Sequence, residues 1–332
     1  MSRQRLVKRV MKPILPFVLA FAIVFARSTI AHADPVSELA SFSVFDKIDI
    51  NDLAASDAKT MHGPPMNGRY LSVQSVYVMP GAPAQVIAAM KNWDATKHRE
   101  LKVLLHGDLS ASPAASDFAK LKNAPDNGAV RALKDKTQKL SNDLQISKED
   151  AKKSGADFVG FWSDVLARRA KTFSSGGMAA LPAYDYGGAT IRANEEVNTL
   201  LKNQDKIRKQ FSGFLSATGI GRGAGSIAPE LYWELLDVDD QGVVTDGASY
   251  SRGQQAVDVS YYASGGYYVA LTFYQMWPVT ANGKASTLVW RGDMISSAAL
   301  ADLHGVERLG SESAMMKDIS KAIAFFRKDT AR

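Results

Sequence analysis

The chain of 332 residues contains no cysteine. This absence excludes disulfides, thiolate metal sites, cysteine nucleophiles and a lipid anchor on a cysteine. The sequence also has no Asn-x-Ser/Thr acceptor for N-glycosylation. A domain of roughly 300 residues can bury a core large enough to fold without disulfides. In an exported chain, these absences favour a bacterial protein over a eukaryotic one.

Long apolar runs are also scarce. The run at residues 14–26 is short for a membrane-spanning helix, and no later stretch is long enough to span a bilayer. It follows a basic segment, residues 3–12, and precedes the small-x-small sequence Ala31-His32-Ala33. This order is typical of a secretory signal peptide, so residues 1–33 are predicted to be cleaved after Ala33. The mature protein is then expected to be periplasmic or secreted, with an uncleaved anchor as the alternative.

The expected mature chain has no surplus of positive charge. The whole sequence has 40 Lys and Arg against 34 Asp and Glu, and the leader alone holds six basic residues and no acidic ones. Basic and acidic residues therefore balance after residue 33. A nucleic-acid partner would need a positive surplus, so none is expected. A transient membrane contact stays open, because residues 149–171 place an aromatic stripe beside a basic end.

Common catalytic and ligand-binding motifs are absent or incomplete. There is no Gly-x-Ser-x-Gly elbow and no His-Glu-x-x-His pair. The glycine-rich segment 219–226 (GIGRGAGS) lacks the Lys-Ser/Thr ending of a phosphate loop. The segment 237–242 (DVDDQG) begins like a calcium loop, but Ala248 stands where a glutamate is needed. No metal or cofactor is predicted from these motifs.

The pattern of apolar residues predicts an α+β fold. A strand ends at the Pro80-Gly81 corner, and a short helix that ends at Trp93 follows. Helical spacing then gives way to five strands with short turns, and a helix closes the chain. The expected divisions are an N-terminal surface extension (34–67), a first strand and helix (68–109), a helical insertion (110–226), and an antiparallel meander with a C-terminal helix (227–332).

Within these divisions the pattern assigns individual elements. Residues 101–107 are left open between a strand and a buried helical turn. The predicted strands are 69–79, 231–238, 243–251, 256–263, 267–277 and 286–295, and the clearest predicted helices are 82–92 and 311–328.

The order of elements resembles the START-like, or SRPBCC, helix-grip superfamily. The stretch MPGAPAQVIAAMKNWDATKH (79–98) is similar to the opening of that family, with Pro83, Val86 and Trp93-Asp94 at the positions of its pattern. Residues 292–328 are similar to its last strand and gripping helix, whereas the insertion has no counterpart in a minimal member. The resemblance implies a curved antiparallel sheet around the C-terminal helix with an apolar cavity between them. It also implies binding or carriage of a hydrophobic small molecule such as a lipid.

Candidate ligand contacts follow from the aromatic and aliphatic faces of the strands. Both faces of strand 267–277 are more apolar than a sheet with one wet side needs. Such residues can form either a packed core or a cavity wall, and methionines on the closing helix suit apolar ligands of varied shape. The predicted ligand contacts are Trp233, Leu271, Phe273, Trp290, Met315, Met316 and Ile319.

Two other functions stay open. An enzyme would use an acid–base pair in the same cavity, with His98, His106 and Asp94 as the candidates. A partner-docking protein would use the helical insertion as its contact surface. The insertion could also serve the carrier as a lid, hinged at its glycine-rich flanks.

Overall fold

An antiparallel sheet forms the centre of the fold. The structure is a computed structural model that describes residues 34–153 and 157–330, so the predicted signal peptide lies outside the described residues. Eight strands in this part of the chain pair in the order β1-β2-β8-β7-β6-β5-β4-β3. The strands are β1 (Lys59–His62), β2 (Tyr70–Pro80), β3 (Val103–Asp108), β4 (Glu230–Val238), β5 (Gln241–Arg252), β6 (Gln255–Ala263), β7 (Val269–Ala281) and β8 (Lys284–Ser296). The predicted α+β class, with a curved sheet and a long C-terminal helix, is confirmed.

Tight turns join the strands of the predicted meander. Between β7 and β8, Asn282 and Gly283 both adopt positive φ angles, 49° and 74°. A two-residue turn of this kind matches the twist of the flanking strands. Between β4 and β5, Asp239 and Asp240 form a second two-residue turn with positive φ angles of 48° and 60°. The calcium-like segment is therefore a hairpin turn, as its missing glutamate suggests.

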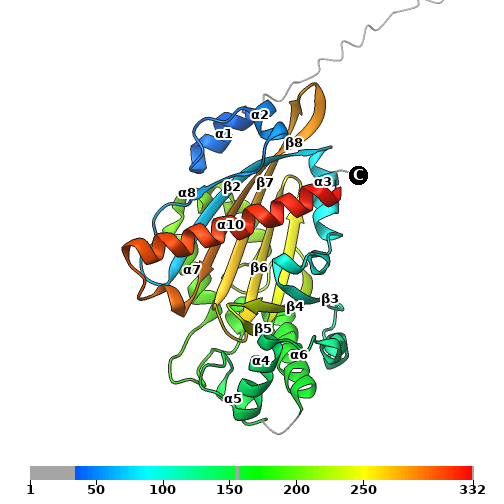
Figure 1. Ribbon diagram of the computed structural model, residues 1–332, viewed down its shortest axis with the longest axis vertical. Coiled ribbons are helices and arrows are strands. Elements are labelled where there is room, and N and C mark those ends of the chain that lie inside the picture. Colours follow the sequence, from blue (N-terminus) through cyan, green and yellow to red (C-terminus); the bar gives the residue numbers. More distant parts are fainter. Residues whose placement is uncertain (1–33, 154–156, 331–332) are drawn as a thin grey trace, which may run out of the picture. The chain divides into compact units, whose positions relative to one another are not determined.

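Two helical layers cover opposite faces of the sheet. Helix α10 (Gly305–Thr330) crosses one face (Figure 1). On that face Val289 and Met276 pack with Ile319 and Ile323 of α10. The helices between β3 and β4 pack on the other face; they are α4 (Gly128–Lys139), α5 (Lys148–Ala151), α6 (Phe158–Gly176), α7 (Ala193–Asn203), α8 (Asp205–Gln210) and α9 (Ser212–Thr218).

The N-terminal segment is built into this second layer. It forms α1 (Pro35–Phe42), α2 (Ile50–Ala55) and the edge strand β1, which pairs with β2. Phe42 meets the Trp290 ring edge-on at 4.9 Å, and the Trp277 indole donates a hydrogen bond of 2.9 Å to Glu38. The prediction of a surface extension was therefore wrong. Its few apolar residues are spaced too irregularly to indicate a buried face, but they complete the core under the aromatic side chains of β7 and β8.

The glycine-rich loop between α9 and β4 is packed closely against the end of α6. Gly177 has a φ of 66°, and a Cβ atom there would lie 2.4 Å from the carbonyl carbon of Gly223. Gly219 caps α9 with a φ of 72°, and a Cβ there would meet the Gly223 oxygen at 2.2 Å. Glycine is required at both positions by the close approach of two backbones. This packing accounts for the glycines without a phosphate ligand.

Candidate functional site

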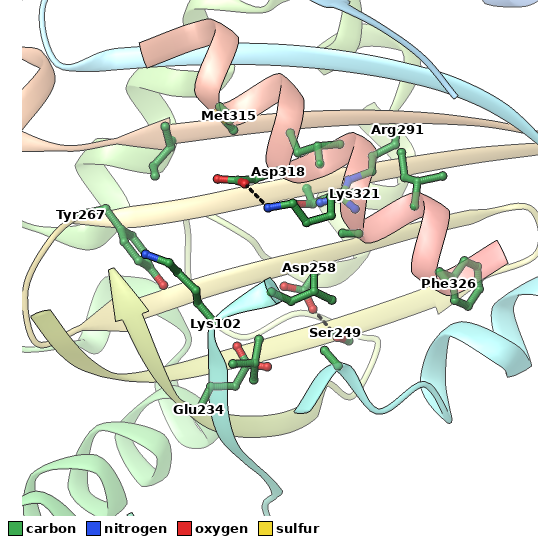
Figure 2. Close-up of a pocket in the computed structure, with 18 of the residues that line it drawn as sticks. Lys102, Glu234, Ser249, Asp258, Tyr267, Arg291, Met315, Asp318, Lys321 and Phe326 are labelled. Atoms are coloured by element: carbon green, nitrogen blue, oxygen red, sulfur yellow. Dashed lines mark hydrogen bonds and ion pairs between the residues drawn. The ribbon is translucent and has the colours of Figure 1, made fainter. Parts of the chain in front are cut away.

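A cavity of about 940 Å³ lies between α10 and the sheet (Figure 2). Residues of β2 to β8, of α3 (Pro83–Lys91) and of α10 line it. Its volume falls in the range of about 300–1,000 Å³ that is usual for small-molecule sites. No residue in the described part of the 110–226 insertion lines this cavity. The insertion packs on the other face of the sheet, so the expectation that it acts as a lid was wrong for this cavity.

Helix α10 is attached at both ends, and the cavity lies beneath its middle. Near its beginning, the Arg308 guanidinium donates to the backbone oxygens of Met66 and Gly68 at 2.7 and 2.8 Å. Near its end, Asp329 accepts a hydrogen bond of 2.9 Å from the Trp93 indole and lies 2.7 Å from His98 Nε2. These contacts hold the helix above the sheet floor (Figure 2).

Trp93 closes one end of the cavity. It directly follows the short α3 helix, whose first turn begins at Pro83 after the Pro80-Gly81 corner. The Trp93 ring meets Phe326 of α10 edge-on at 5.5 Å, and both side chains line the cavity. The short helix and its tryptophan thus bring apolar area to the cavity mouth, as expected from the sequence.

The roof of the cavity is largely apolar. Met315, Ile319, Ile323 and Phe326 of α10 face it. They recur at helical spacing because residues three and four apart share one face of a helix. Other apolar lining residues come from α3 and from the segment before α10; they are Ile87, Met90, Leu300 and Leu303. A ligand beneath α10 therefore meets mostly hydrocarbon; the exception is the ion pair of Asp318 with Lys321, 3.0 Å apart on the same helix, which also lines the cavity (Figure 2).

The floor of the cavity is polar, and a half-buried carboxyl lies in it. Asp258 of β6 accepts a hydrogen bond of 2.7 Å from the Tyr232 hydroxyl and a second one from Ser249 (Figure 2). Burial raises the pKa of Asp258 to about 6, and the hydrogen bonds from Ser249 and Tyr232 oppose this rise. The carboxyl is therefore mostly ionised above neutral pH.

Arg291 is the cation of the floor, and a neighbouring acid neutralises it. Its Nε and Nη2 atoms donate to Asp293 at distances of 2.7 to 3.0 Å, and Thr272 donates to the same carboxylate at 2.9 Å. The guanidinium also lies 5.6 Å from the centre of the Tyr274 ring. The pairing with Asp293 leaves little net positive charge at this point of the cavity.

A second ionisable pair lies at the β3 edge. His106 Nδ1 is 3.2 Å from Glu234, and the imidazole stacks on the Tyr232 ring at 5.6 Å. The hydrogen bond to Glu234 is the main cause that raises the pKa of His106 above its usual value. His106 and Glu234 both line the cavity.

Acidic side chains outnumber permanently basic ones around the cavity. Four lining side chains carry a fixed positive charge: Lys91, Lys102, Arg291 and Lys321. The acidic lining residues are Glu100, Asp108, Glu230, Glu234, Asp237, Asp239, Asp258 and Asp318. Carboxylates therefore outnumber fixed cations around this cavity.

The predicted catalytic residues do not come together. His98 pairs with Asp329 and stacks on Phe325 at 4.1 Å. Asp94 accepts hydrogen bonds from Thr96, which hold the pKa of Asp94 below its usual value, and it caps the turn that follows. Of the three candidates, His106 lines the cavity, whereas His98 and Asp94 do not. The pair that does form is His106 with Glu234.

The predicted ligand contacts are divided between the two faces of the sheet. Met315 and Ile319 line the cavity, and Met316 packs beside it. The four strand residues, Trp233, Leu271, Phe273 and Trp290, are fully buried on the opposite face and do not line this cavity.

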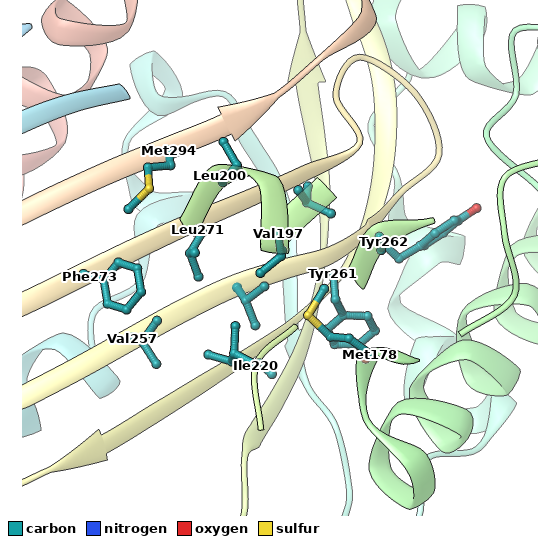
Figure 3. Packing of buried hydrophobic residues seen from close by; sticks show 14 of the residues in the cluster. Met178, Val197, Leu200, Ile220, Val257, Tyr261, Tyr262, Leu271, Phe273 and Met294 are labelled. Atoms are coloured by element: carbon teal, nitrogen blue, oxygen red, sulfur yellow. The ribbon is translucent and has the colours of Figure 1, made fainter. Parts of the chain in front are cut away.

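The buried face already has partners for these strand residues. Figure 3 shows Leu271 and Phe273 among side chains of α7 such as Leu200. The Trp233 and Trp290 indoles donate to the Asp117 backbone and to Gln74, at 3.2 and 3.1 Å. Their assignment to the cavity wall is corrected, because the helical layer covers the more aromatic face.

The cavity residues that the sequence analysis missed are polar strand residues. Asp258, Ser249 and Arg291 belong to alternating positions that a sequence reading assigns to solvent. One sequence feature could have identified these residues: a row of hydrogen-bonding side chains at facing positions of neighbouring strands. Asp258 lies opposite Thr272, and Thr272 lies opposite Asp293. Such a row suits a polar floor beneath a covering helix.

Comparisons with known proteins leave the family open. No protein-family model matches the chain. No curated protein matches it either. One solved structure, described as a START superfamily protein from Mycobacterium smegmatis, aligns with 14% identity and a TM-score of 0.21. The alignment covers 28% of this chain and 64% of that structure. A likeness at this level shows no family, so the START-like assignment stays a prediction.

Two absences among the described residues bear on the kind of site. Within residues 34–153 and 157–330, no group of three or more histidine, aspartate or glutamate side chains is placed to hold a metal ion. No helix in the same part of the chain is long and apolar enough to cross a membrane. The fold and the cavity define an α+β protein with a small-molecule-sized cavity between a curved sheet and its C-terminal helix.

Proposed function

We propose that the protein binds and carries a hydrophobic small molecule, such as a lipid, in the cavity between α10 and the sheet. The observation that carries this proposal is the cavity itself, about 940 Å³ in volume, with a roof of aliphatic and aromatic side chains. Transfer of an apolar chain from water to this roof is favourable by about 0.8 kcal/mol for each buried methylene. A leader that directs the chain to the periplasm or the cell exterior is part of the same proposal.

The attachment of α10 supports a role in reversible uptake. Polar contacts hold the helix near its two ends. In its middle the Ser320 hydroxyl lies 2.9 Å from the Thr60 hydroxyl, and Ile319 and Ile323 pack on the sheet beside the cavity. A ligand can enter if one end of the helix is released, and the contacts that re-form afterwards enclose it. Lids that close over a site by a small number of contacts commonly control the access of ligands.

Blocking the cavity tests the proposal. Ala322 of α10 lines the cavity, so tryptophan at this position will occupy space that a ligand needs. We expect Ala322→Trp to weaken the binding of N-phenyl-1-naphthylamine, a hydrophobic fluorescent probe, by about tenfold, or about 1.4 kcal/mol. Fluorescence titration of the purified protein measures this change.

A matched control lies on the same helix. Ala324 is exposed and does not line the cavity, so Ala324→Trp should leave probe binding unchanged. If the unsubstituted protein, Ala322→Trp and Ala324→Trp all bind the probe equally well, the probe binds outside the cavity. That result would refute the proposal that this cavity is the binding site. Native mass spectrometry of the purified protein, followed by solvent extraction, would identify any molecule that co-purifies with it.

A further inference from the structure

The polar floor contains acceptor groups that the protein itself leaves unused. Tyr77 of β2 is 2% exposed and lines the cavity, yet its hydroxyl makes no hydrogen bond within the described part of the chain. The Tyr274 hydroxyl, also at the cavity wall, has no hydrogen-bond partner among the described residues either. Both hydroxyls can donate and accept hydrogen bonds, so at the cavity wall they can pair with a polar group of a bound ligand.

Charged groups of both signs act on these hydroxyls: Arg291 and Asp293 on both, Arg327 on Tyr77 and Asp258 on Tyr274. Arg291 is paired with Asp293, which leaves Asp258 and Glu234 as the further carboxylates of the floor. Among the described residues, the hydrogen-bond partners of Asp258 are hydroxyl groups, and Arg291, whose charge lowers the pKa of Asp258, is itself paired with Asp293. An anionic ligand end would be repelled here, whereas a cation would replace the missing counter-charge.

The geometry points to a ligand class, and this inference rests on the proposed function. We infer that the ligand carries a protonated amine at one end of an apolar body, and that Asp258 receives the ammonium group. The hydroxyls of Tyr77 and Tyr274 are further acceptors on the same floor, and the roof of α10 covers the apolar body. An ammonium group has three donors and no acceptor, which matches a floor rich in oxygen acceptors.

Three probes of equal chain length test the inference. Dodecylamine, dodecanol and dodecanoate differ in the polar end alone, and each can displace N-phenyl-1-naphthylamine from the purified protein at about pH 8, below its micelle concentration. We expect dodecylamine to bind at least about tenfold more tightly than dodecanol, and dodecanoate to bind most weakly, because hydrogen bonds to charged groups are the stronger ones. This comparison needs no variant.

Substitution of Asp258 tests whether this carboxyl causes the preference for an amine. Asp258→Asn should reduce the affinity for dodecylamine by about tenfold and leave that for dodecanol within about threefold. Asp240→Asn is the matched control, because Asp240 is exposed, lies in the β4–β5 turn and does not line the cavity. It should leave all three affinities unchanged.

The outcomes separate this inference from the proposed function. Equal binding of the three probes, or tightest binding of dodecanoate, would overturn the amine preference and leave the carrier proposal standing. Failure of all three to displace the naphthylamine would overturn both. An amine preference that Asp258→Asn leaves unchanged would overturn the assignment to this carboxyl.

Discussion

Replacing Arg169 with methionine will lower the free energy of unfolding by about 3–5 kcal/mol. Arg169 of α6 is 2% exposed, and its Nη2 atom donates a hydrogen bond of 2.8 Å to Asp150, which is fully buried. Its guanidinium also donates to the Pro182 carbonyl at 3.2 Å and lies 4.2 Å from the centre of the Tyr262 ring. Methionine fills similar space but leaves a buried carboxylate without its main counter-ion.

The direction of the Asp150 pKa supports this expectation. Burial alone would raise the pKa of Asp150, but the Arg169 charge and the hydrogen bonds with Ser147 outweigh burial and hold it below the usual value. The carboxylate is therefore charged in the folded protein, and removal of Arg169 leaves only Arg168 and Ser147 to offset its cost of desolvation. Urea unfolding followed by tryptophan fluorescence measures the loss.

Neighbouring variants make the test specific. Arg168 also pairs with Asp150, at 2.7 Å, but its side chain is 33% exposed. Arg168→Met should therefore cost much less than Arg169→Met. The double variant Asp150→Asn/Arg169→Met should lose less than the sum of the two single variants, because no unpaired carboxylate remains. A loss below about 1 kcal/mol for Arg169→Met would contradict the expected role of the pair.

Replacing Asp246 with asparagine will raise the free energy of unfolding by about 1–3 kcal/mol at about pH 8. Asp246 of β5 is fully buried, and neither carboxyl oxygen has a hydrogen-bond partner among the described residues. Burial raises the pKa of Asp246 well above its usual value, although the Arg169 charge opposes the rise. Asparagine has nearly the same shape and cannot ionise.

The sign of the pH dependence follows from the raised pKa. The folded protein holds the Asp246 proton to a higher pH than the unfolded chain, so stability that the protonated form supplies is lost as pH rises through the folded pKa. The advantage of Asp246→Asn should therefore grow with pH and nearly disappear close to pH 4, about the usual value for an aspartate. Urea unfolding at several pH values measures this. Destabilisation by Asp246→Asn at about pH 8 would show that the carboxylate has a stabilising partner.

Much of the fold was predictable because local signals agreed with one another. Alternating residues and the Asn282-Gly283 turn placed β7 and β8 to within a few residues of their observed ends. The helical stripe that includes Ile319 and Ile323 identified the core of α10, although the helix begins at Gly305, earlier than predicted. The edge strand β1 was missed, since a strand of four residues with mostly exposed side chains has no clear alternation.

The site was less predictable because it depends on which face of the sheet each helix covers. Along β7, Leu271 and Phe273 point to one face, and Thr272 and Tyr274 point to the other. Hydrophobicity favours the first pair as ligand contacts, but a helical layer distant in sequence already covers them. A polar cavity floor has the same sequence pattern as a solvent-facing surface. Only the contacts of α10 distinguish a cavity floor from a solvent-facing surface. Those contacts link residues that are far apart in the chain.

The pairing of β2 with β8 has a consequence for how the chain folds. These strands come from opposite ends of the described sequence, yet they pair along their whole length, from Tyr70 with Ser296 to Pro80 with Ser286. Loop-closure entropy must be overcome before such a distant pairing becomes favourable, and this slows folding. Until β8 has been synthesised, β2 lacks its central partner and the cavity has no complete floor. A chain shortened before Lys284 can therefore neither join β2 to β7 nor complete the cavity.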